Sequence, residues 1–562
     1  MTTVRIRMPS GEVETVPYGT PVSRFTGELS KQDEQNTQAP VIAALIDNEL
    51  VSLTYKLKFN ASFAPVRLDS PLGIAAYKRS LCFLLTIAAR EVFPERTLVI
   101  GHSLGDGYFY SFTDLEKVSD ADLALLEARM RDLAARNLPI ERTVISYTEA
   151  REYFEFHGQA ATALLLEFRN ENKIAVTRCG EFMDLAHSPL VPFTGVLDVF
   201  QLYRYGTGFV LRFPEKPGAD RGDDGARFAP FQGSSQLYSV YHEYKNWGKV
   251  LGVASVGQLN RISAGKGVKD FIYVAEALHN KKIARIADSI YERGKSVKVI
   301  LIAGPSSSGK TTFTKKLAIE LTVHGYTPVM LSLDDYFVPR EQTPRDADGN
   351  YDFEVLEAID VELLNQHLLR LFQGEEVQIP VFDFKTGGRR ESGKKLILPE
   401  NGILLIEGIH GLNDRLTPRV PAASKFKVYV SALTQLNLDE HNRVSTTINR
   451  LIRRMVRDHQ FRGHSALRTL TMWPSVRRGE DKNIFPFQDS ADACFNSALD
   501  YELGVLKSIA EPLLHTVKPG AEPYHEALRL LSFLEYFIPI PVKYVPPASL
   551  LREFVGDSDF KY

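Results

Sequence analysis

The sequence has few cysteines and no long apolar run, and each absence excludes a class of protein. Its 562 residues include three cysteines, Cys82, Cys179 and Cys494, which lie far apart and form no CxxC pair. We therefore expect neither a disulfide framework nor a zinc knuckle, and a reducing cytosol suits such a chain. No stretch of 18 apolar residues occurs, and charged and apolar residues alternate near the N-terminus. A membrane-spanning helix and a signal peptide are not expected, so the sequence predicts a cytoplasmic protein.

The sequence also has almost no net charge, because 67 lysines and arginines are balanced by 69 aspartates and glutamates. A global field that would attract nucleic acid or an acidic membrane is therefore not expected, and any contact with RNA would need a local patch. A hydrophobic content of 44% is typical of globular domains with ample core, and the length suits roughly three or four of them. The sequence indicates no oligomeric state.

One stretch, residues 297–312, has the pattern of a phosphate-binding loop. Its sequence VKVILIAGPSSSGKTT is an apolar strand, a Gly-rich loop that matches GxxxxGK[ST], and the start of a helix. Glycines let successive N–H groups approach a polyphosphate, and the helix directs its positive end at the same charge. The alternative, a Ser/Gly surface loop, explains neither the strand nor the helix. The predicted nucleotide-binding residues are Gly304, Ser306, Ser307, Ser308, Gly309, Lys310, Thr311 and Thr312.

Carboxylates follow two further apolar strands. TPVMLSLDDYF places Asp334 after one strand, and GILLIEGIHGL ends another at Glu407. Because ligands bind at the carboxyl ends of strands in doubly wound sheets, both acids should face the nucleotide. Asp334 is the predicted base that accepts a hydroxyl proton, although an aspartate that caps the next turn gives the same pattern. Thr311 and Glu407 are the predicted ligands of Mg²⁺.

An arginine-rich segment, NRLIRRMVRDHQFRG, follows these strands. At helical spacing its first four arginines share one face, which for an isolated helix is usually solvated. Beside a phosphate loop, a mobile arginine lid that closes over the γ-phosphate is the stronger interpretation. The segment contributes Arg450, Arg453, Arg454, Arg457 and Arg462.

Several motifs in order resemble the phosphoribulokinase/uridine kinase family over residues 295–500. These are GPSSSGKTT, LSLDDYF, YDFEVLEAID, IPVFDF, LLIEGI and RLIRRMVRDHQFRG, and uridine kinase is the nearest in pattern. The resemblance implies a kinase that uses ATP and Mg²⁺, with Asp334 as base on a 5′-hydroxyl. By the same resemblance Lys310, Arg453 and Arg457 assist the transfer, and Arg450 and Arg454 help to bind ATP.

The acceptor side departs from that family. Glu354 stands where uridine kinases hold the ribose diol with an aspartate, and Phe337, Phe382 and Gly387 replace the tyrosines and histidine that read the pyrimidine. Since an apolar pocket discriminates less than a hydrogen-bonding one, strict selectivity for uridine is in doubt. The candidate acceptor-binding residues are Asp334, Phe337, Glu354, Phe382, Asp383, Arg389, Arg390 and Arg462.

The front half resembles a different family. VRIRM, a Ser-Gly turn and EVETV form a hairpin pattern, and with the segments that follow they resemble the TGS module at the front of threonyl-tRNA synthetases. Residues 70–215 resemble the editing-type domain of the same enzymes. That domain uses HxxxH and CxxxH for deacylation, whereas the corresponding positions here read Tyr77, Leu81, Ala186 and Leu190. We therefore expect the fold without that chemistry.

Together these patterns predict a multidomain α/β protein. Its parts are a TGS-like β-grasp module over residues 1–62, a degenerate editing-like α+β domain over 63–235 that ends in a loop, a helical connector over 236–294, a P-loop doubly wound parallel sheet over 295–545 and a tail over 546–562. The predicted function is phosphorylation of a ribose-type 5′-hydroxyl by a nucleoside kinase. The alternatives are a kinase of a non-nucleoside alcohol and a nucleotide-gated RNA- or tRNA-binding factor.

Overall fold

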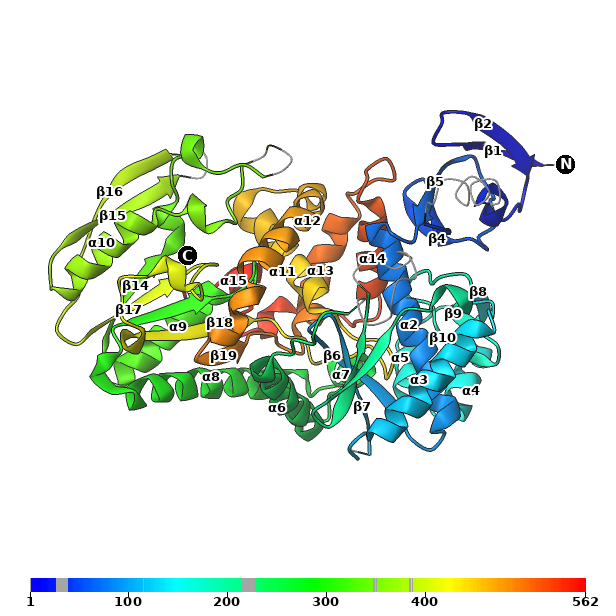
Figure 1. Ribbon diagram of the computed structural model, residues 1–562, viewed down its shortest axis with the longest axis horizontal. Coiled ribbons are helices and arrows are strands. Elements are labelled where there is room, and N and C mark those ends of the chain that lie inside the picture. The colour runs from blue at the N-terminus through cyan, green and yellow to red at the C-terminus, as the bar shows by residue number, and fades with distance from the viewer. Residues whose placement is uncertain are drawn as a thin grey trace.

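The computed structural model describes residues 2–26, 39–114, 116–214, 228–346, 349, 351–383, 386 and 388–561. Figure 1 shows the N-terminal strands at one end of the long axis and the predicted kinase sheet at the other. Most of the Gly- and Asp-rich loop predicted at 214–235 lies outside the described residues.

The N-terminal module is a five-stranded mixed sheet with the order β2-β1-β5-β3-β4. Its strands are β1 (Thr3–Arg7), β2 (Val13–Pro17), β3 (Val41–Ile46), β4 (Glu49–Ser52) and β5 (Ala61–Arg67). The first two strands form the expected hairpin, and β1 runs parallel to β5 at the centre of the sheet. Alternate residues such as Val4 and Ile6 are buried, as period-2 patterning requires. This arrangement is a β-grasp, in agreement with the sequence.

The second domain packs a long helix, α2 (Pro71–Val92), against two antiparallel sheets. Ser70 caps this helix by accepting a hydrogen bond from Gly73 N, and Pro71 stands at its first turn. Among the described helices, α2 alone is long and apolar enough to cross a membrane, and most of its apolar window is buried in this domain. The strands are β6 (Leu98–Leu104), β7 (Gly107–Phe112), β8 (Glu141–Ser146), β9 (Lys173–Cys179), β10 (Phe182–Leu185), β11 (Gln201–Tyr205) and β12 (Gly208–Arg212), and the other helices are α3 (Asp120–Ala135), α4 (Tyr147–Phe156) and α5 (Ala160–Leu166).

Three helices connect the second domain to the catalytic half. They are α6 (Ser235–Leu251), α7 (Val256–Ala264) and α8 (Val268–Glu292). The buried face of α8 includes Ile283, Ile286 and Ile290, which join the largest hydrophobic core of the chain. The connector is thus part of the packing that supports the catalytic sheet.

The catalytic half is built on a five-stranded parallel sheet with the order β14-β17-β13-β18-β19. Its strands are β13 (Val299–Ala303), β14 (Thr327–Ser332), β17 (Gly402–Glu407), β18 (Lys425–Ser431) and β19 (Ala493–Asn496). Ile300 and Ile302 point into one core and Val299 and Leu301 into another, so both faces of β13 are covered. Parallel strands that are covered on both faces have continuous apolar sequences, so these strands could be recognised from the sequence. The predicted doubly wound sheet is confirmed.

Helices and one hairpin complete this half. The helices are α9 (Lys310–Val323), α10 (Val361–Phe372), α11 (Thr446–Arg462), α12 (Ala466–Asn483), α13 (Glu502–Leu514), α14 (Tyr524–Leu534) and α15 (Arg552–Val555), and the hairpin is β15 (Val377–Asp383) with β16 (Gly388–Leu396). Short 3₁₀ turns occur at η1 (Val22–Phe25), η2 (Thr194–Val196), η4 (Gly294–Ser296), η5 (Leu333–Tyr336), η6 (Arg340–Gln342), η7 (Leu356–Ala358), η8 (Asp414–Leu416), η9 (Ala422–Ser424), η10 (Phe485–Ser490) and η11 (Val542–Tyr544).

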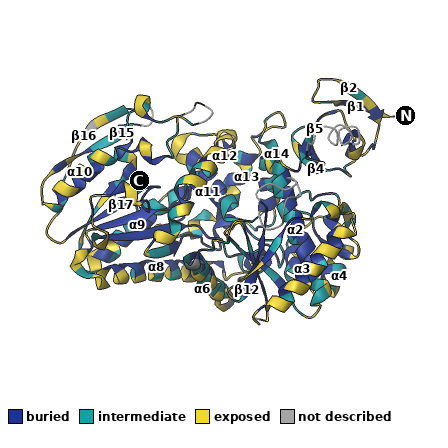
Figure 2. Ribbon diagram, in the orientation of Figure 1, coloured by how far each residue is buried: buried dark blue, intermediate teal, exposed yellow. Residues whose placement is uncertain are grey.

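The C-terminal segment is part of the core rather than a loose tail. Leu550, Leu551 and Phe554 are buried, and α15 packs against α11. In Figure 1 the C-terminus lies beside the catalytic sheet, and Figure 2 shows the dark blue of buried residues concentrated in α9 and the strands next to it. The last residues of the chain therefore reach the predicted nucleotide site.

A turn between β18 and α11 docks the catalytic half on the second domain. Asn437 Nδ2 donates to Ile100 O at 2.8 Å, and Ile100 N donates to Glu440 O at 3.0 Å. Glu440 Oε1 also accepts a hydrogen bond from Ala161 N at 2.7 Å. These hydrogen bonds hold the two domains together at this turn.

Candidate active site at the phosphate loop

The phosphate loop connects β13 to α9, and its glycines are required by close contacts. A Cβ on Gly304 would lie 1.9 Å from Val430 O, and one on Gly309 would lie 2.4 Å from Leu550 Cδ2. Gly309 also has φ +84°, and Ser307 adopts φ +57°, both in the left-handed region. The hydroxyls of Ser307 and Ser308 are buried without a hydrogen-bond partner among the described residues. The loop thus has the curved backbone that cradles phosphate groups.

Lys310 begins α9 and folds back over the loop. Its Nζ donates to Gly304 O at 2.9 Å and to Pro305 O at 3.2 Å. Burial lowers the pKa of Lys310, whereas the charges of Glu407, Glu553 and Asp334 oppose that shift. The ammonium group is therefore held at the loop among three carboxylates.

Thr311 and Glu407 form the expected pair. The Thr311 hydroxyl is 3.1 Å from both carboxylate oxygens of Glu407, at the end of β17. Burial raises the pKa of Glu407 to about 7, although Lys310 opposes the shift. Oxygen donors beside a phosphate loop suit Mg²⁺, which usually takes one or two carboxylates together with phosphate oxygens. Among the described residues no group of three acidic, histidine or cysteine side chains that could hold a metal ion occurs.

Asp334 lies in η5, just beyond the end of β14. Its backbone N–H donates to Ser332 Oγ at 3.3 Å, which is a weak cap of the turn, and Asp334 as a whole residue is exposed. Neighbouring protein atoms that shield the carboxylate from water raise the pKa of Asp334. The positive charges of Lys310, Arg462 and Arg457 lower it by a smaller amount. Asp334, Glu407 and Lys310 all lie close enough to shift one another's titration, so the structure brings together the three predicted groups.

The arginine segment differs from the predicted mobile lid, because its first three arginines are interior residues of α11. Arg450 and Arg453 are 1% and 0% exposed and form ion pairs with Glu480 and Glu502 respectively. Arg450 Nε donates to Ser306 O at 2.9 Å. Arg453 also donates to Ser307 O at 3.4 Å, and Arg454 donates to Ser306 Oγ at 2.8 Å. These side chains hold the phosphate loop through hydrogen bonds. Because they are buried in the core, they are not a solvated face and cannot close over the loop as a lid.

Arg457 and Arg462 remain on the open side of the site. Arg457 donates to Asp458 Oδ1 at 2.8 Å, and Arg462 lies 3.5 Å from the same oxygen. The Arg462 side chain is 52% exposed. The charges of both arginines lower the pKa of Asp334, so both lie close to its carboxylate.

Three predicted acceptor contacts have other roles in the structure. Phe337 and Phe382 are 6% exposed and pack in the core with ring centroids 5.5 Å apart. Arg389 donates to Phe337 O at 2.7 Å, to Tyr336 O at 3.0 Å and to Asp360 at 2.9 Å. These three residues therefore position η5 and its Asp334 instead of lining an open pocket. Gly387 lies outside the described residues, and Arg390 is exposed.

Glu354 stays beside the phosphate loop. Burial and the charge of Glu480 raise its pKa to about 7, while Arg454 and Lys310 lower it. A Cβ on Gly479 of α12 would lie 2.6 Å from Glu354 Cβ, so α12 holds this side chain in place. Asp383 is half-buried at the end of β15, where its carboxylate lies 3.4 Å from Thr386 N.

Two further carboxylates lie at the loop, and no sequence motif predicted them. Glu480 Oε1 accepts a hydrogen bond from Ser306 N at 2.9 Å, across 174 residues of sequence. Glu553 Oε2 accepts from Thr312 N at 3.1 Å and from its hydroxyl at 2.7 Å, across 241 residues. Neither residue belongs to a local motif, and Glu553 lies in the segment predicted to be a tail.

In the second domain, the structure separates the four positions that replace the deacylase residues. Ala186 and Leu190 line a cavity, whereas Tyr77 and Leu81 are 1% and 0% exposed in the core of the domain. The Tyr77 hydroxyl is 3.0 Å from both Val199 O and Val199 N. The face of α2 that meets the cavity instead carries residues such as Arg79 and Phe83.

With this geometry established, comparison with known proteins assigns the two halves. Residues 299–503 match the model of the Phosphoribulokinase / Uridine kinase family. The N-terminal region is similar to threonine--tRNA ligases. It is 28% identical to threonine--tRNA ligase 2 of Bacillus subtilis and 32% identical to threonine--tRNA ligase of Burkholderia multivorans, each over 202 residues, 36% of this chain and 31% of the relative. Both resemblances predicted from the sequence are confirmed, and the chain spans about a third of the length of these relatives.

Two solved structures have low similarity to this chain. One is titled "Structure of a Possible Uridine Kinase from Bacillus stearothermophilus", with 20% identity over 38% of this chain and 98% of that one, and a TM-score of 0.27. Another is the D-glycerate 3-kinase from Cryptococcus neoformans, with 16% identity over 47% of this chain and 86% of that one, and a TM-score of 0.20.

Proposed function

We propose that this protein is an ATP- and Mg²⁺-dependent kinase that phosphorylates a primary alcohol of a small molecule. The observation that carries the proposal is the meeting of Asp334 with Lys310 and Glu407 at the carboxyl edge of the sheet. A nucleotide-binding switch needs the loop, the lysine and the metal-binding carboxylate, but only a phosphotransferase needs a base at this point.

Each of these residues has a distinct part in the proposed reaction. Lys310 would exchange its two carbonyl acceptors for phosphate oxygens, and Arg457 and Arg462 would neutralise the transferring group. Asp334 would accept the proton of the acceptor hydroxyl as its oxygen bonds to the γ-phosphorus and the bond to ADP breaks. Thr311 and Glu407 would hold Mg²⁺, which would supply the remaining neutralisation of phosphate charge.

For the acceptor, we propose a ribose-type 5′-hydroxyl, as in a nucleoside kinase. Glu354 supports this assignment because it lies beside the loop and can accept hydrogen bonds from hydroxyl groups. The core positions of Phe337 and Phe382 leave these residues unsuited to reading a base, so a non-nucleoside alcohol is the alternative acceptor. We further propose a cytoplasmic location, which the free state of the three cysteines supports.

A nucleotide-gated RNA- or tRNA-binding factor is the second candidate. It is favoured by the similarity of the N-terminal region to threonine--tRNA ligases and by the contacts of residues 437–443 with the second domain. Such a factor would bind nucleotide through the loop and would not depend on Asp334.

The test is a screen of nucleosides, sugars and small alcohols for ATP-dependent phosphorylation. We expect at least one acceptor, a loss of transfer with Lys310→Ala, and a loss of roughly 10² to 10⁴ in kcat with Asp334→Asn. Asp288→Asn, on the exposed side of α8, is the matched control and should remain active. Full activity of Asp334→Asn would refute the base, and nucleotide binding without any acceptor would favour the RNA-binding candidate.

A further inference from the structure

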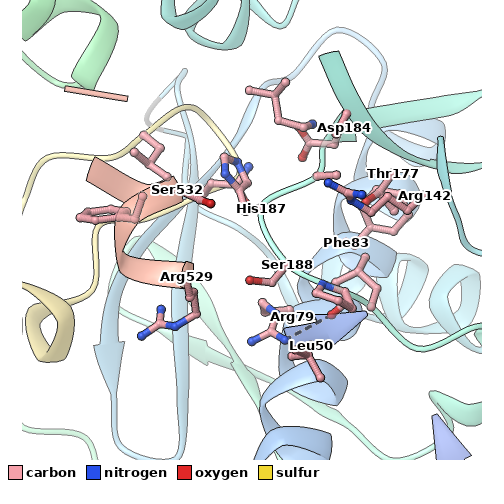
Figure 3. A pocket seen from close by; sticks show the side chains of 18 of the residues that line it. Leu50, Arg79, Phe83, Arg142, Thr177, Asp184, His187, Ser188, Arg529 and Ser532 are labelled. Atoms are coloured by element: carbon pink, nitrogen blue, oxygen red, sulfur yellow. Dashed lines mark hydrogen bonds between the residues drawn. The ribbon is translucent and has the colours of Figure 1, made fainter. Parts of the chain in front are cut away.

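A cavity of about 740 Å³ lies where the three parts of the chain meet, away from the phosphate loop (Figure 3). Its walls come from β4 of the N-terminal module, from α2 and residues 184–190 of the second domain, and from α14 and residues 438–448 of the catalytic half. The volume falls within the usual range of sites for small molecules. The proposed phosphotransfer makes no use of this cavity.

The lining carries more positive charge than its own carboxylates neutralise. Seven lysine and arginine side chains and five carboxylates line the cavity. Four of the carboxylates are already engaged, because Glu171 and Glu535 pair with Arg169, Glu526 pairs with Arg529, and Asp184 pairs with His441. Within the described part of the chain, Arg79, Arg142 and Arg443 form no ion pair.

Arg79 is one of these arginines, and most of its donors have no acceptor among the described residues. Of the five N–H donors of its guanidinium, the structure uses one, from NH2 to Pro189 O at 3.2 Å, and its buried Nε has no partner among the described residues. Arg529 of α14 lies nearby on the facing wall, as Figure 3 shows. Burial and the charge of Arg529 together lower the pKa of Arg79 to about 10. The Glu526 carboxylate, which pairs with Arg529, offsets part of the repulsion between these two guanidinium groups, and an anion bound between them would offset more of it.

We propose that this cavity binds a small organic phosphate, with its phosphoryl group between Arg79 and Arg529 and its remaining atoms toward Arg142. Guanidinium groups bind phosphate oxygens in pairs, which makes arginine the usual residue for such recognition. A macromolecular ligand is disfavoured because the net charge of the chain is −2 and the cationic groups lie inside a cavity between domains.

The site also has a direct connection to the phosphate loop. Ser445, Thr447 and Ile448 line the cavity at the start of α11, and one turn further on Arg450 and Arg454 contact Ser306. A ligand in the cavity therefore contacts the helix that holds the loop. We expect the ligand to change the affinity for nucleotide, and nucleotide to change the affinity for the ligand by the same factor.

The experiment uses the full chain with Lys310→Ala, so that phosphate binding at the loop is removed. Inorganic phosphate, ribose 5-phosphate and uridine 5′-monophosphate are titrated by calorimetry up to about 10 mM. We expect one of the two organic phosphates to bind more tightly than inorganic phosphate, and which of them does so identifies the source of the phosphoryl group. Adding Arg79→Met should weaken that binding about tenfold or more, whereas Arg151→Met on the exposed face of α4 should not change it.

A second variant tests whether the arginine variant loses binding only because it misfolds. Ser188→Phe fills the cavity without removing a charge, and it should also abolish binding while the melting temperature stays near that of the parent. Binding that survives Arg79→Met in a folded protein would overturn the proposal. So would the absence of binding by all three phosphates, or binding of an RNA oligonucleotide alone. In the chain with Lys310 intact, the bound phosphate should shift the Kd for ATP, and Arg79→Met should remove that shift.

Discussion

Glu553→Gln should tighten nucleotide binding, because the Glu553 carboxylate occupies donors that a phosphate would use. Thr312 is the third residue of α9, so its N–H belongs to the first turn, whose donors the α-helical hydrogen-bond pattern does not use. Glu553 accepts from this N–H at 3.1 Å and from the Thr312 hydroxyl at 2.7 Å. Hydrogen bonds to a charged group contribute about 1.5–3 kcal/mol each, against about 1 kcal/mol for neutral ones. Since glutamine keeps an acceptor oxygen, we expect a net weakening of this contact by about 1–2 kcal/mol.

The weaker contact destabilises only the nucleotide-free state, in which Glu553 occupies the Thr312 donors. The Kd for ATP should therefore decrease roughly 5- to 30-fold, since 1.4 kcal/mol corresponds to a factor of ten. Calorimetric titration with ATP measures the Kd, and the melting temperature of the free protein should fall in the same variant. Glu292→Gln, exposed at the end of α8, is the control and should change neither quantity. Weaker ATP binding by Glu553→Gln would refute this reasoning, because it would mean that Glu553 helps to hold the nucleotide.

Three further results are expected. Because the pKa of Glu407 is raised to about 7 and only its ionised form binds a cation well, Mg²⁺ affinity should rise between about pH 6 and pH 8, and Glu407→Gln should remove this dependence in a titration with Mg²⁺. Arg450→Met leaves Glu480 buried without its main partner, so urea unfolding should show a loss of about 3–5 kcal/mol. The second domain should not deacylate mischarged tRNA, and measurable hydrolysis would contradict the expectation.

The fold of the catalytic half could be predicted because its signals are local. The apolar run of β13, the glycines of the loop and the start of α9 lie within 16 consecutive residues, and each requires a specific backbone. The positions of Asp334 and Glu407 could be predicted in the same way. An acidic residue directly after a buried parallel strand lies at the carboxyl edge of the sheet, where ligands bind. For these elements, the residues that determine the local structure are neighbours in the sequence.

The arginine helix shows where local patterns fail. Arginines at helical spacing are typical of a solvated face, and the sequence contains no sign that Arg450 and Arg453 are buried. Their burial depends on Glu480 and Glu502, which lie 30 and 49 residues away and reach α11 through the packing of α12 and α13. The partner of a buried charge cannot be identified from a pattern within one helix.

This burial changes how the loop can respond to nucleotide. Arg450 and Arg453 are held by ion pairs inside the core, and removing them from these partners would leave charges unpaired at a cost of several kcal/mol. The groups that can move at smaller cost are Lys310, which donates to the loop's own carbonyls, and Glu553, which lies on a short C-terminal helix. Nucleotide should therefore displace these two groups and leave the internal ion pairs of α11 intact. On this reasoning a rigid α11 can transmit a change in the cavity to the loop, since it contacts both.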